Sequence, residues 1–374
     1  MGSSIALSHF DGFHGLVGRT VHTPNEVTHL PQIIQRILGM SGEQSLRYIA
    51  EIAARERHWQ RHPTGFACIA CMDGRVHLPT ITRTAMGLVK PYRAMGGRFE
   101  IWWPAFAKRF TNWADAVLRH YGERCCVFVT YHHSASNNRE LGCAGWACDT
   151  VAARAHAEHL AADINEVYRD QVYAIVVGIE TDRGILNLHG PRGTVTGAMQ
   201  NGTSEDHVRM ALRETFLGMP PRILEDIIPF VTGNAAYVTE HGPTPRPDDV
   251  LCHQELVIAV GHGFDYWISE ANLAVAVDDA DPNLDTPIAT AAKIVANNLK
   301  RAGPKAEALL LASVPFERQG TPWNLAVKRA EGLGNFALEC ILASQPSLLD
   351  NGRLRVLIGV TSDQTKQLEP IAFA

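Results

Sequence analysis

Three short apolar runs alternate with two helical stretches, and this alternation constrains the fold more than any other feature of the chain. The runs cover residues 66–71, 125–131 and 172–178, and the helical stretches between them cover 107–121 and 150–167. Continuous apolar runs of this length are typical of strands buried on both faces. Strands that alternate with helices predict an α/β fold with a largely parallel central sheet.

Residues 25–59 predict a small helical region before the first run, with breaks at Gly39 and at Ser41-Gly42. A Pro-rich segment at 242–249 predicts a domain boundary. We therefore expect a helical N-terminal region at 1–60, a middle domain at 61–240 and a C-terminal domain at 250–374.

Metal-ligating residue types follow the first two apolar runs. Cys71 ends the first run, His132 follows the second, and Cys143 closes the polar loop after it. Two thiolates and one imidazole suit Zn²⁺ and leave the fourth tetrahedral position for water, as in catalytic zinc sites. Water bound there ionises to hydroxide near neutral pH. The sequence therefore predicts a catalytic zinc site, with His133 as a competing ligand to its neighbour.

Asp73 and Arg75 lie two and four residues after Cys71. In an extended chain, their side chains would therefore point to the same side as that of Cys71. A carboxylate held by an arginine stays ionised and off the metal. It can then accept a hydrogen bond from the zinc-bound hydroxide and orient that nucleophile. We expect Asp73 and Arg75 to be the catalytic pair.

Cys68 and Cys71 also form a Cys-x-x-Cys pair, which indicates a redox motif or half of a structural zinc site as alternatives. A redox pair is expected at a helix N-terminus, whereas Cys68 lies inside an apolar run. Because side chains alternate along a strand, Cys68 would point away from Cys71. We interpret Cys68 as a core thiol, since free cysteine is often buried. The same interpretation applies to Cys125, Cys126, Cys252 and Cys340, and Cys148 has no assigned role.

The last third of the chain resembles the middle third in several segments. The matched segments are 176–182 with 357–363, 125–131 with 308–314, the following helix with 324–331, and 69–75 with 258–264. In these matches Val260, His262 and Phe264 replace Cys71, Asp73 and Arg75, while His132 falls near Pro315 and the Cys143 loop has no counterpart. The pattern predicts a duplication whose second copy has lost the metal site.

These residues resemble a known family. Cys71-Met72-Asp73-Gly74-Arg75, followed by a distant His and Cys, is similar to the pattern of the β-class carbonic anhydrases. The long gap from His132 to Arg139-Glu140-Leu141-Gly142-Cys143-Ala144-Gly145 resembles the carboxysome-shell branch (CsoSCA, formerly the ε class). Residues 177–182 and 260–265 resemble that branch too, as does a metal-free second copy. The resemblance covers about residue 63 to the C-terminus.

The resemblance implies a β-carbonic-anhydrase-like sheet with flanking helices, duplicated as an active and a degenerate copy. It implies one Zn²⁺ per chain on Cys71, His132 and Cys143, with His132 favoured over His133, and an Asp73/Arg75 dyad. The implied reaction is reversible hydration of CO₂ to bicarbonate by a zinc-bound hydroxide. The degenerate domain would stand in for a second subunit and wall the cleft, and a homodimer fits the resemblance.

Members of the branch associate with the carboxysome shell and with Rubisco through a longer N-terminal part. Only about sixty residues precede the motif here, so a free cytoplasmic enzyme is an equal expectation.

Composition narrows the remaining functions. A formal charge of −5 and a pI of about 6.4 provide no basic surface for nucleic acid. No apolar run reaches eighteen residues, so we expect no membrane span. The first nine residues show no secretory signal, which predicts a reducing compartment where cysteines rarely form disulfides.

Two other functions stay open from the sequence. One is hydrolysis of a CO₂ analogue such as carbonyl sulfide on the same scaffold, and the other is a non-catalytic zinc or redox protein that binds a partner. Candidates for proton transfer are His77, His133 and His262, because imidazole titrates near neutral pH.

Overall fold

The structure of the protein is a computed structural model that describes residues 30–121, 124–135, 142–198, 204–242, 252–264, 268, 270–317, 321–350 and 352–374. The chain forms two compact units. Unit 1 comprises Met1–Ile49, Glu255–Ile268 and Asp285–Ala374, and unit 2 comprises Ala50–Gln254 and Ser269–Leu284. The predicted α/β class is confirmed, with two sheets of six and five strands flanked by helices.

Unit 2 contains the six-stranded sheet, in the order β2-β1-β3-β4-β5-β6. Its strands are β1 (Gly65–Cys71), β2 (Val89–Ala94), β3 (Cys125–His133), β4 (Val172–Glu180), β5 (Ile185–Gly190) and β6 (Gly193–Thr196). The first four strands in this order are parallel, and β5 and β6 add antiparallel edges. All three apolar runs therefore form the parallel centre of the sheet, as predicted.

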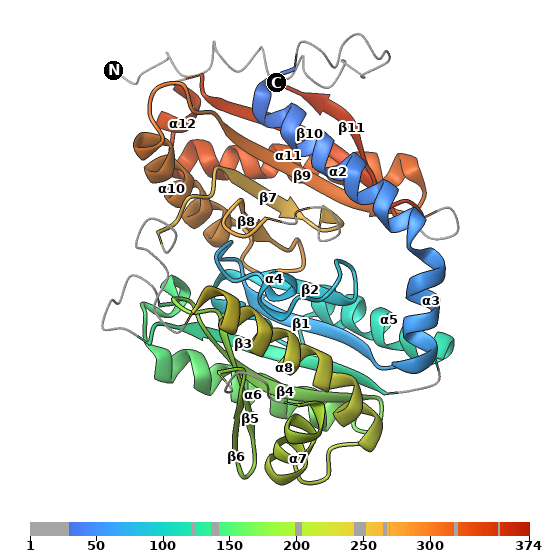
Figure 1. Cartoon of the computed structure of the whole chain (residues 1–374). Coiled ribbons are helices and arrows are strands. Elements are labelled where there is room, and N and C mark those ends of the chain that lie inside the picture. The colour runs from blue at the N-terminus through green and yellow to red at the C-terminus, as the bar shows by residue number, and fades with distance from the viewer. Residues whose placement is uncertain are drawn as a thin grey trace. The chain divides into compact units, whose positions relative to one another are not determined.

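Helices cover both faces of this sheet (Figure 1). They are α4 (Leu78–Thr82), α5 (Pro104–Tyr121), α6 (Thr150–Tyr168), α7 (Glu205–Thr215) and α8 (Pro221–His241), with short 3₁₀ turns η3 (Met95–Gly97) and η5 (Ala144–Trp146). Helix α3 (Ile52–Arg61) contributes no residue to either core. Ala67 and Ile69 of β1 face α5 and α6, whereas Phe66 and Cys68 face α7 and α8. Alternate side chains of β1 thus enter two cores, which explains why the run is apolar throughout.

Unit 1 holds four strands of the second sheet, in the order β11-β10-β9-β7, and the fifth strand, β8 (Ala274–Val277), is grouped with unit 2. The elements of unit 1 are α2 (Gln32–Ala50), β7 (Val257–Gly261), α10 (Asp285–Arg301), β9 (Ala308–Phe316), α11 (Trp323–Ser344), α12 (Ser347–Asp350), β10 (Leu354–Ser362) and β11 (Leu368–Phe373). Helix α11 packs closely on the sheet, because a Cβ at Gly334 would lie 2.8 Å from Ile358 Cδ1.

The predicted helix breaks at Gly39 and Ser41-Gly42 are wrong, because α2 runs through all three residues. Ser41 is buried, and its hydroxyl accepts a hydrogen bond of 2.8 Å from the backbone N–H of Leu368. This bond and the burial of Ile34 and Ile37 favour a continuous helix against the roughly 1 kcal/mol that each helical glycine costs. The Pro-rich boundary lies almost entirely outside the described residues. The compact units also differ from the expected domains, since residues 30–49 group with the C-terminal segments and 269–284 with the middle of the chain.

One pattern of strand pairing occurs in both units. The order β1-β3-β4-β5, with two parallel pairings and one antiparallel, recurs as β7-β9-β10-β11. The register nevertheless corrects one predicted match. Ile69 pairs with Val129, and Val129 with Val176. If 125–131 matches 308–314, Val129 corresponds to Ala312, which pairs with Val260, so Ile69 corresponds to Val260. If 176–182 matches 357–363, Val176 corresponds to Leu357, and the pairing leads through Leu311 to Ala259 instead. The match of Ile69 with Ile258 agrees with neither, and the other two matches also differ from each other by one residue, because short apolar runs align at several offsets. The duplication itself stays a prediction.

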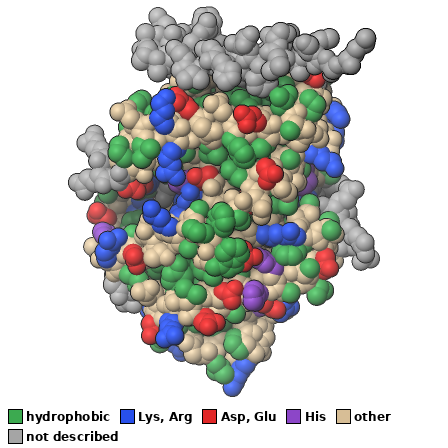
Figure 2. All heavy atoms as spheres, turned by 180° about the vertical axis from the view of Figure 1, so that it is seen from behind, with side chains coloured by type: hydrophobic (Ala, Val, Ile, Leu, Met, Phe, Trp, Pro, Cys, Tyr) green, Lys and Arg blue, Asp and Glu red, His purple; other side chains and the backbone are tan. Residues whose placement is uncertain are grey.

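The surface mixes charges of both signs. On the face seen in Figure 2, Lys and Arg side chains are interspersed with Asp and Glu, with hydrophobic side chains between them. Among the helices that the structure describes, none combines the length and hydrophobicity that a membrane span requires.

Candidate metal centre

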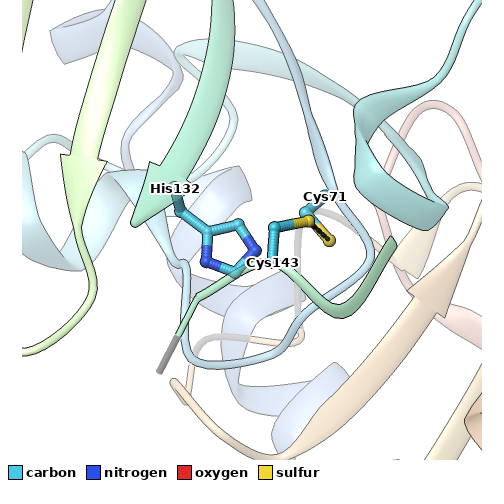
Figure 3. Close-up of side chains that lie close together, drawn as sticks. All are labelled: Cys71, His132 and Cys143. Atoms are coloured by element: carbon cyan, nitrogen blue, oxygen red, sulfur yellow. Dashed lines mark hydrogen bonds between the residues drawn. The ribbon is translucent and has the colours of Figure 1, made fainter. Parts of the chain in front are cut away.

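Cys71, His132 and Cys143 meet in unit 2. Their possible ligand atoms all lie within 4.8 Å of one another, and all three residues are buried. Figure 3 shows the imidazole of His132 and the two thiols pointing toward one another. The structure thus brings together the three residues that the sequence analysis selected, from positions far apart in the chain.

The sheet brings the first two of these residues together. Strands β1 and β3 are parallel neighbours, and Ile69 pairs with Val129. Their carboxyl ends therefore lie side by side, with Cys71 as the last residue of β1 and His132 as the penultimate residue of β3. The carboxyl edge of a parallel sheet is where α/β proteins commonly place their sites.

The turn η5 brings Cys143 to the same place. Trp146 donates a 2.9 Å hydrogen bond from Nε1 to the carbonyl of Gly96, and Arg98 lies 3.9 Å from the centroid of the Trp146 ring. Gly145 allows this close approach, because a Cβ on it would lie 2.6 Å from the backbone N of Gly96. Docking η5 against η3 therefore fixes the backbone next to Cys143.

His132 is held through one ring nitrogen, which leaves the other available. Its Nδ1 lies 3.1 Å from Thr181 Oγ1. Its Nε2 is buried with no hydrogen-bond partner, and the nearest carboxylate oxygen, Oδ2 of Asp73, lies 3.7 Å away. A buried polar atom without a partner is costly. A metal ion bound to Nε2 would remove that cost.

The two thiols also fit a cation. Their sulfur atoms lie 3.7 Å apart, with Cys143 donating to Cys71. This hydrogen bond lowers the pKa of Cys71 and raises that of Cys143, where burial acts in the same direction. Two adjacent buried thiolates repel each other, so one proton stays between the sulfurs unless a cation replaces it. The set of one imidazole and two thiols suits Zn²⁺.

Asp73 and Arg75 form a buried, multiply bonded pair beside these ligands. Arg75 donates from Nη2 to Oδ2 over 2.6 Å, from Nε to Oδ1 over 3.0 Å, and from its backbone N to Oδ1 over 2.9 Å. Burial opposes ionisation of Asp73, but the charge of Arg75, the charge interaction with His253 and the hydrogen bonds of Arg75 together outweigh it and lower the pKa of the carboxyl. Asp73 is therefore an ionised acceptor held in one orientation.

The backbone around Asp73 is fixed by segments that sequence reasoning missed. The guanidinium of Arg93, in β2, donates to the carbonyl of Val76. From the segment around β8, the backbone N–H of Ala276 donates to Met72 O over 3.1 Å, and that of Asn272 donates to Gly74 O. Thr181, which holds His132, was missed as well. A polar residue just beyond β4, the parallel neighbour of β3, was the available signal.

The remaining cysteines lie apart from the ligand set. Cys68, Cys125 and Cys126 are core thiols as predicted, and burial raises the pKa of Cys68 and of Cys125 to about 12. The same prediction is wrong for Cys252, which is exposed, and for Cys340, which is partly exposed. Both lie beside apolar runs, and sequence proximity to such a run does not determine burial.

The histidines considered for proton transfer take different positions. His133 stacks on Tyr131, with ring centroids 5.6 Å apart, and burial lowers its pKa. The Nδ1 of His77 lies 2.7 Å from Thr80 Oγ1 at the start of α4. His262 follows β7 in unit 1, where its backbone N–H donates to Ser313 O. None of the three belongs to the group of ligand atoms around Cys71.

Comparison with known proteins assigns no family to the chain. No protein-family model matches it, and no curated protein matches it significantly. The metal centre must therefore be interpreted from its own residues.

Proposed function

We propose that the protein is a zinc-dependent carbonic anhydrase that interconverts CO₂ and bicarbonate. The observation that carries the proposal is the unpartnered Nε2 of His132, buried with two thiols and 3.7 Å from the ionised carboxylate of Asp73. A metal ligand set and a fixed anion next to it are what this reaction requires. The resemblance to the carboxysome-shell branch of the β-class enzymes supports the same activity.

Cys71, His132 and Cys143 would hold the zinc ion. Bound zinc supplies a hydroxide nucleophile at neutral pH. With three protein ligands, a tetrahedral ion keeps one position for this chemistry. Among the described residues, no fourth Cys, His, Asp or Glu belongs to this group. A catalytic zinc therefore fits the ligand set better than a structural one.

The role of Asp73 follows from its hydrogen bonds. Arg75 occupies both carboxylate oxygens and keeps the group ionised. Each oxygen still has lone pairs, so Asp73 can accept a hydrogen bond from water on the side of His132. A fixed acceptor orients a water-derived nucleophile toward a linear substrate. Arg75 acts through Asp73 as a positioning residue.

Metal content and CO₂ hydration, measured on the same purified full-length protein, test the proposal. We expect about one mole of zinc per chain and hydration that disappears when a chelator removes the metal. The Cys143→Ser variant should lose most of the zinc, whereas Cys340→Ser, at a partly exposed position away from the ligand group, should keep it. Zinc-loaded protein without hydration would overturn the proposed reaction, and protein that cannot be loaded would overturn the metal site.

Hydrolysis of carbonyl sulfide is the second candidate. It needs the same metal, the same fixed acceptor and a linear substrate. Turnover of both gases by the same zinc-loaded sample separates the two, since the favoured substrate has the larger kcat/KM.

A further inference from the structure

Thr181 lies at the end of β4, where that strand accompanies β3 to the metal centre. Two buried residues, Thr181 and Asp182, follow the last strand residue Glu180. The backbone N–H of Thr181 donates to His133 O over 2.8 Å, which extends the strand pairing by one residue. This bond places the Thr181 hydroxyl 3.1 Å from His132 Nδ1.

Asp182 secures the same stretch of chain. Its carboxylate accepts a hydrogen bond of 3.2 Å from the Ser134 hydroxyl and bonds of 3.1 Å from the backbone N–H of Ala135 to both oxygens. The residues on both sides of Thr181 and of His132 are therefore fixed. The contact between the Thr181 hydroxyl and the imidazole has little freedom to change.

The geometry points to Thr181 as the positioning residue that selects the metal-binding tautomer of His132. This inference rests on the proposed metal site. A neutral imidazole carries its proton on one nitrogen and a lone pair on the other. If Nδ1 carries the proton and donates it to Thr181 Oγ1, the lone pair of Nε2 faces the two sulfurs. If Nε2 carries the proton, His132 cannot bind a metal through that atom.

The alternative is that Thr181 only fills space. Thr181→Val separates the two, because valine has nearly the same shape and lacks the hydroxyl. Thr181→Ser is the reciprocal change, since it keeps the hydroxyl and removes a methyl group. Thr82→Val is the matched control. Thr82 is also buried, and its hydroxyl donates over 2.8 Å to the carbonyl of Leu78 in α4 rather than to a metal ligand.

The first measurement is zinc affinity of the full-length protein by competition with a chromogenic chelator. Loss of an outer partner of a metal-ligating histidine typically weakens metal binding about 10–100-fold. We expect that loss in Thr181→Val and zinc affinity close to the unmodified protein in Thr181→Ser and Thr82→Val. Unchanged affinity in Thr181→Val would overturn the inference, as would an equal loss in Thr181→Ser.

The second measurement does not need zinc. Two-dimensional ¹H–¹⁵N spectra of metal-free protein, labelled on histidine nitrogen, report which ring nitrogen carries the proton, and His132→Gln assigns the signals. We expect His132 to be protonated on Nδ1 in the unmodified protein and to show a mixed or reversed tautomer in Thr181→Val. Protonation on Nε2 in the unmodified protein would overturn the inference. If the protein binds no zinc but shows the expected tautomers, the proposed function and the metal-binding part of the inference fail, whereas control of the His132 tautomer by Thr181 stands.

Discussion

Replacing Asp73 with asparagine removes a charge but keeps the shape of the side chain, so it tests stability and chemistry separately. Asp73 and Arg75 are each 5% exposed, and three donor groups of Arg75 bind the carboxylate. Asp73→Asn removes the carboxylate charge that the buried guanidinium of Arg75 binds. Breaking a buried ion pair in this way costs about 3–5 kcal/mol of unfolding free energy. Unit 2 contains about 220 residues, for which about 2–4 °C per kcal/mol applies, so its Tm should fall by about 6–20 °C.

The chemical effect of Asp73→Asn should be larger than its effect on zinc content. Because none of the zinc ligands changes, we expect about one zinc per chain. Loss of a group that fixes the orientation of the reacting water typically lowers a rate about 10²-fold, and CO₂ hydration should fall by about that factor. Stopped-flow hydration with a pH indicator, on samples matched for zinc, measures it.

A second variant shows whether the loss of rate follows from the loss of stability. Asp73→Asn combined with Arg75→Met removes both charges and replaces the guanidinium with an apolar chain. Part of the lost Tm should return, since the double variant removes both charges of the ion pair, whereas hydration should stay low. Unchanged hydration in Asp73→Asn, or hydration that recovers together with Tm in the double variant, would refute the assignment of Asp73 to the reaction.

Three further predictions concern the surroundings of the centre. Gly145→Ala should weaken zinc binding, because its Cβ would lie 2.6 Å from the backbone of Gly96. The control Gly332→Ala, with open space around it in α11, should leave zinc affinity unchanged. Equal zinc affinities of the two variants would contradict the docking of η5. Arg109→Ala should lower the unfolding free energy by about 3–5 kcal/mol in a urea titration, because it removes a largely buried cation that binds both Asp278 and Asp279. A change below about 1 kcal/mol would contradict this. Burial lowers the pKa of His189 from 6.5 to about 4, so the unfolded chain binds a proton that the folded chain does not, and stability should fall as the pH decreases from about 6.5 to 4. His189→Gln should flatten that part of the profile, and an unchanged slope would show that other groups cause it.

The parallel core could be predicted because its signals are local. The side chains of β1, β3 and β4 are buried on both faces of the sheet. Each of these strands therefore appears in the sequence as a continuous apolar run. Cys71 and His132 could be placed together because parallel neighbouring strands end at the same edge. These inferences need only the order of the elements and the chemistry of the side chains.

Features that depend on tertiary contacts could not be predicted. The buried face of α2 includes Ser41, whose hydroxyl binds the backbone of Leu368, more than three hundred positions away in the sequence. The register of β7 against β9 is not encoded in apolar runs that match at several offsets. Thr181 gained its relation to His132 only when the pairing of β3 and β4 placed the two side chains together.

The spacing of the three ligands along the chain has a consequence for the order of folding and metal loading. Cys71 and His132 lie 61 positions apart, and His132 and Cys143 lie 11 apart. Closing the longer loop costs about 1.5 kcal/mol more chain entropy than closing the shorter one. In the folded protein, pairing of β1 with β3 already holds the ends of the longer loop together. The proposed zinc ion would therefore bind a sheet whose pairing does not depend on it, unlike the ion of a zinc finger. A chelator should remove the metal without unfolding the sheet, and the rate of reloading should report on access to the centre rather than on folding.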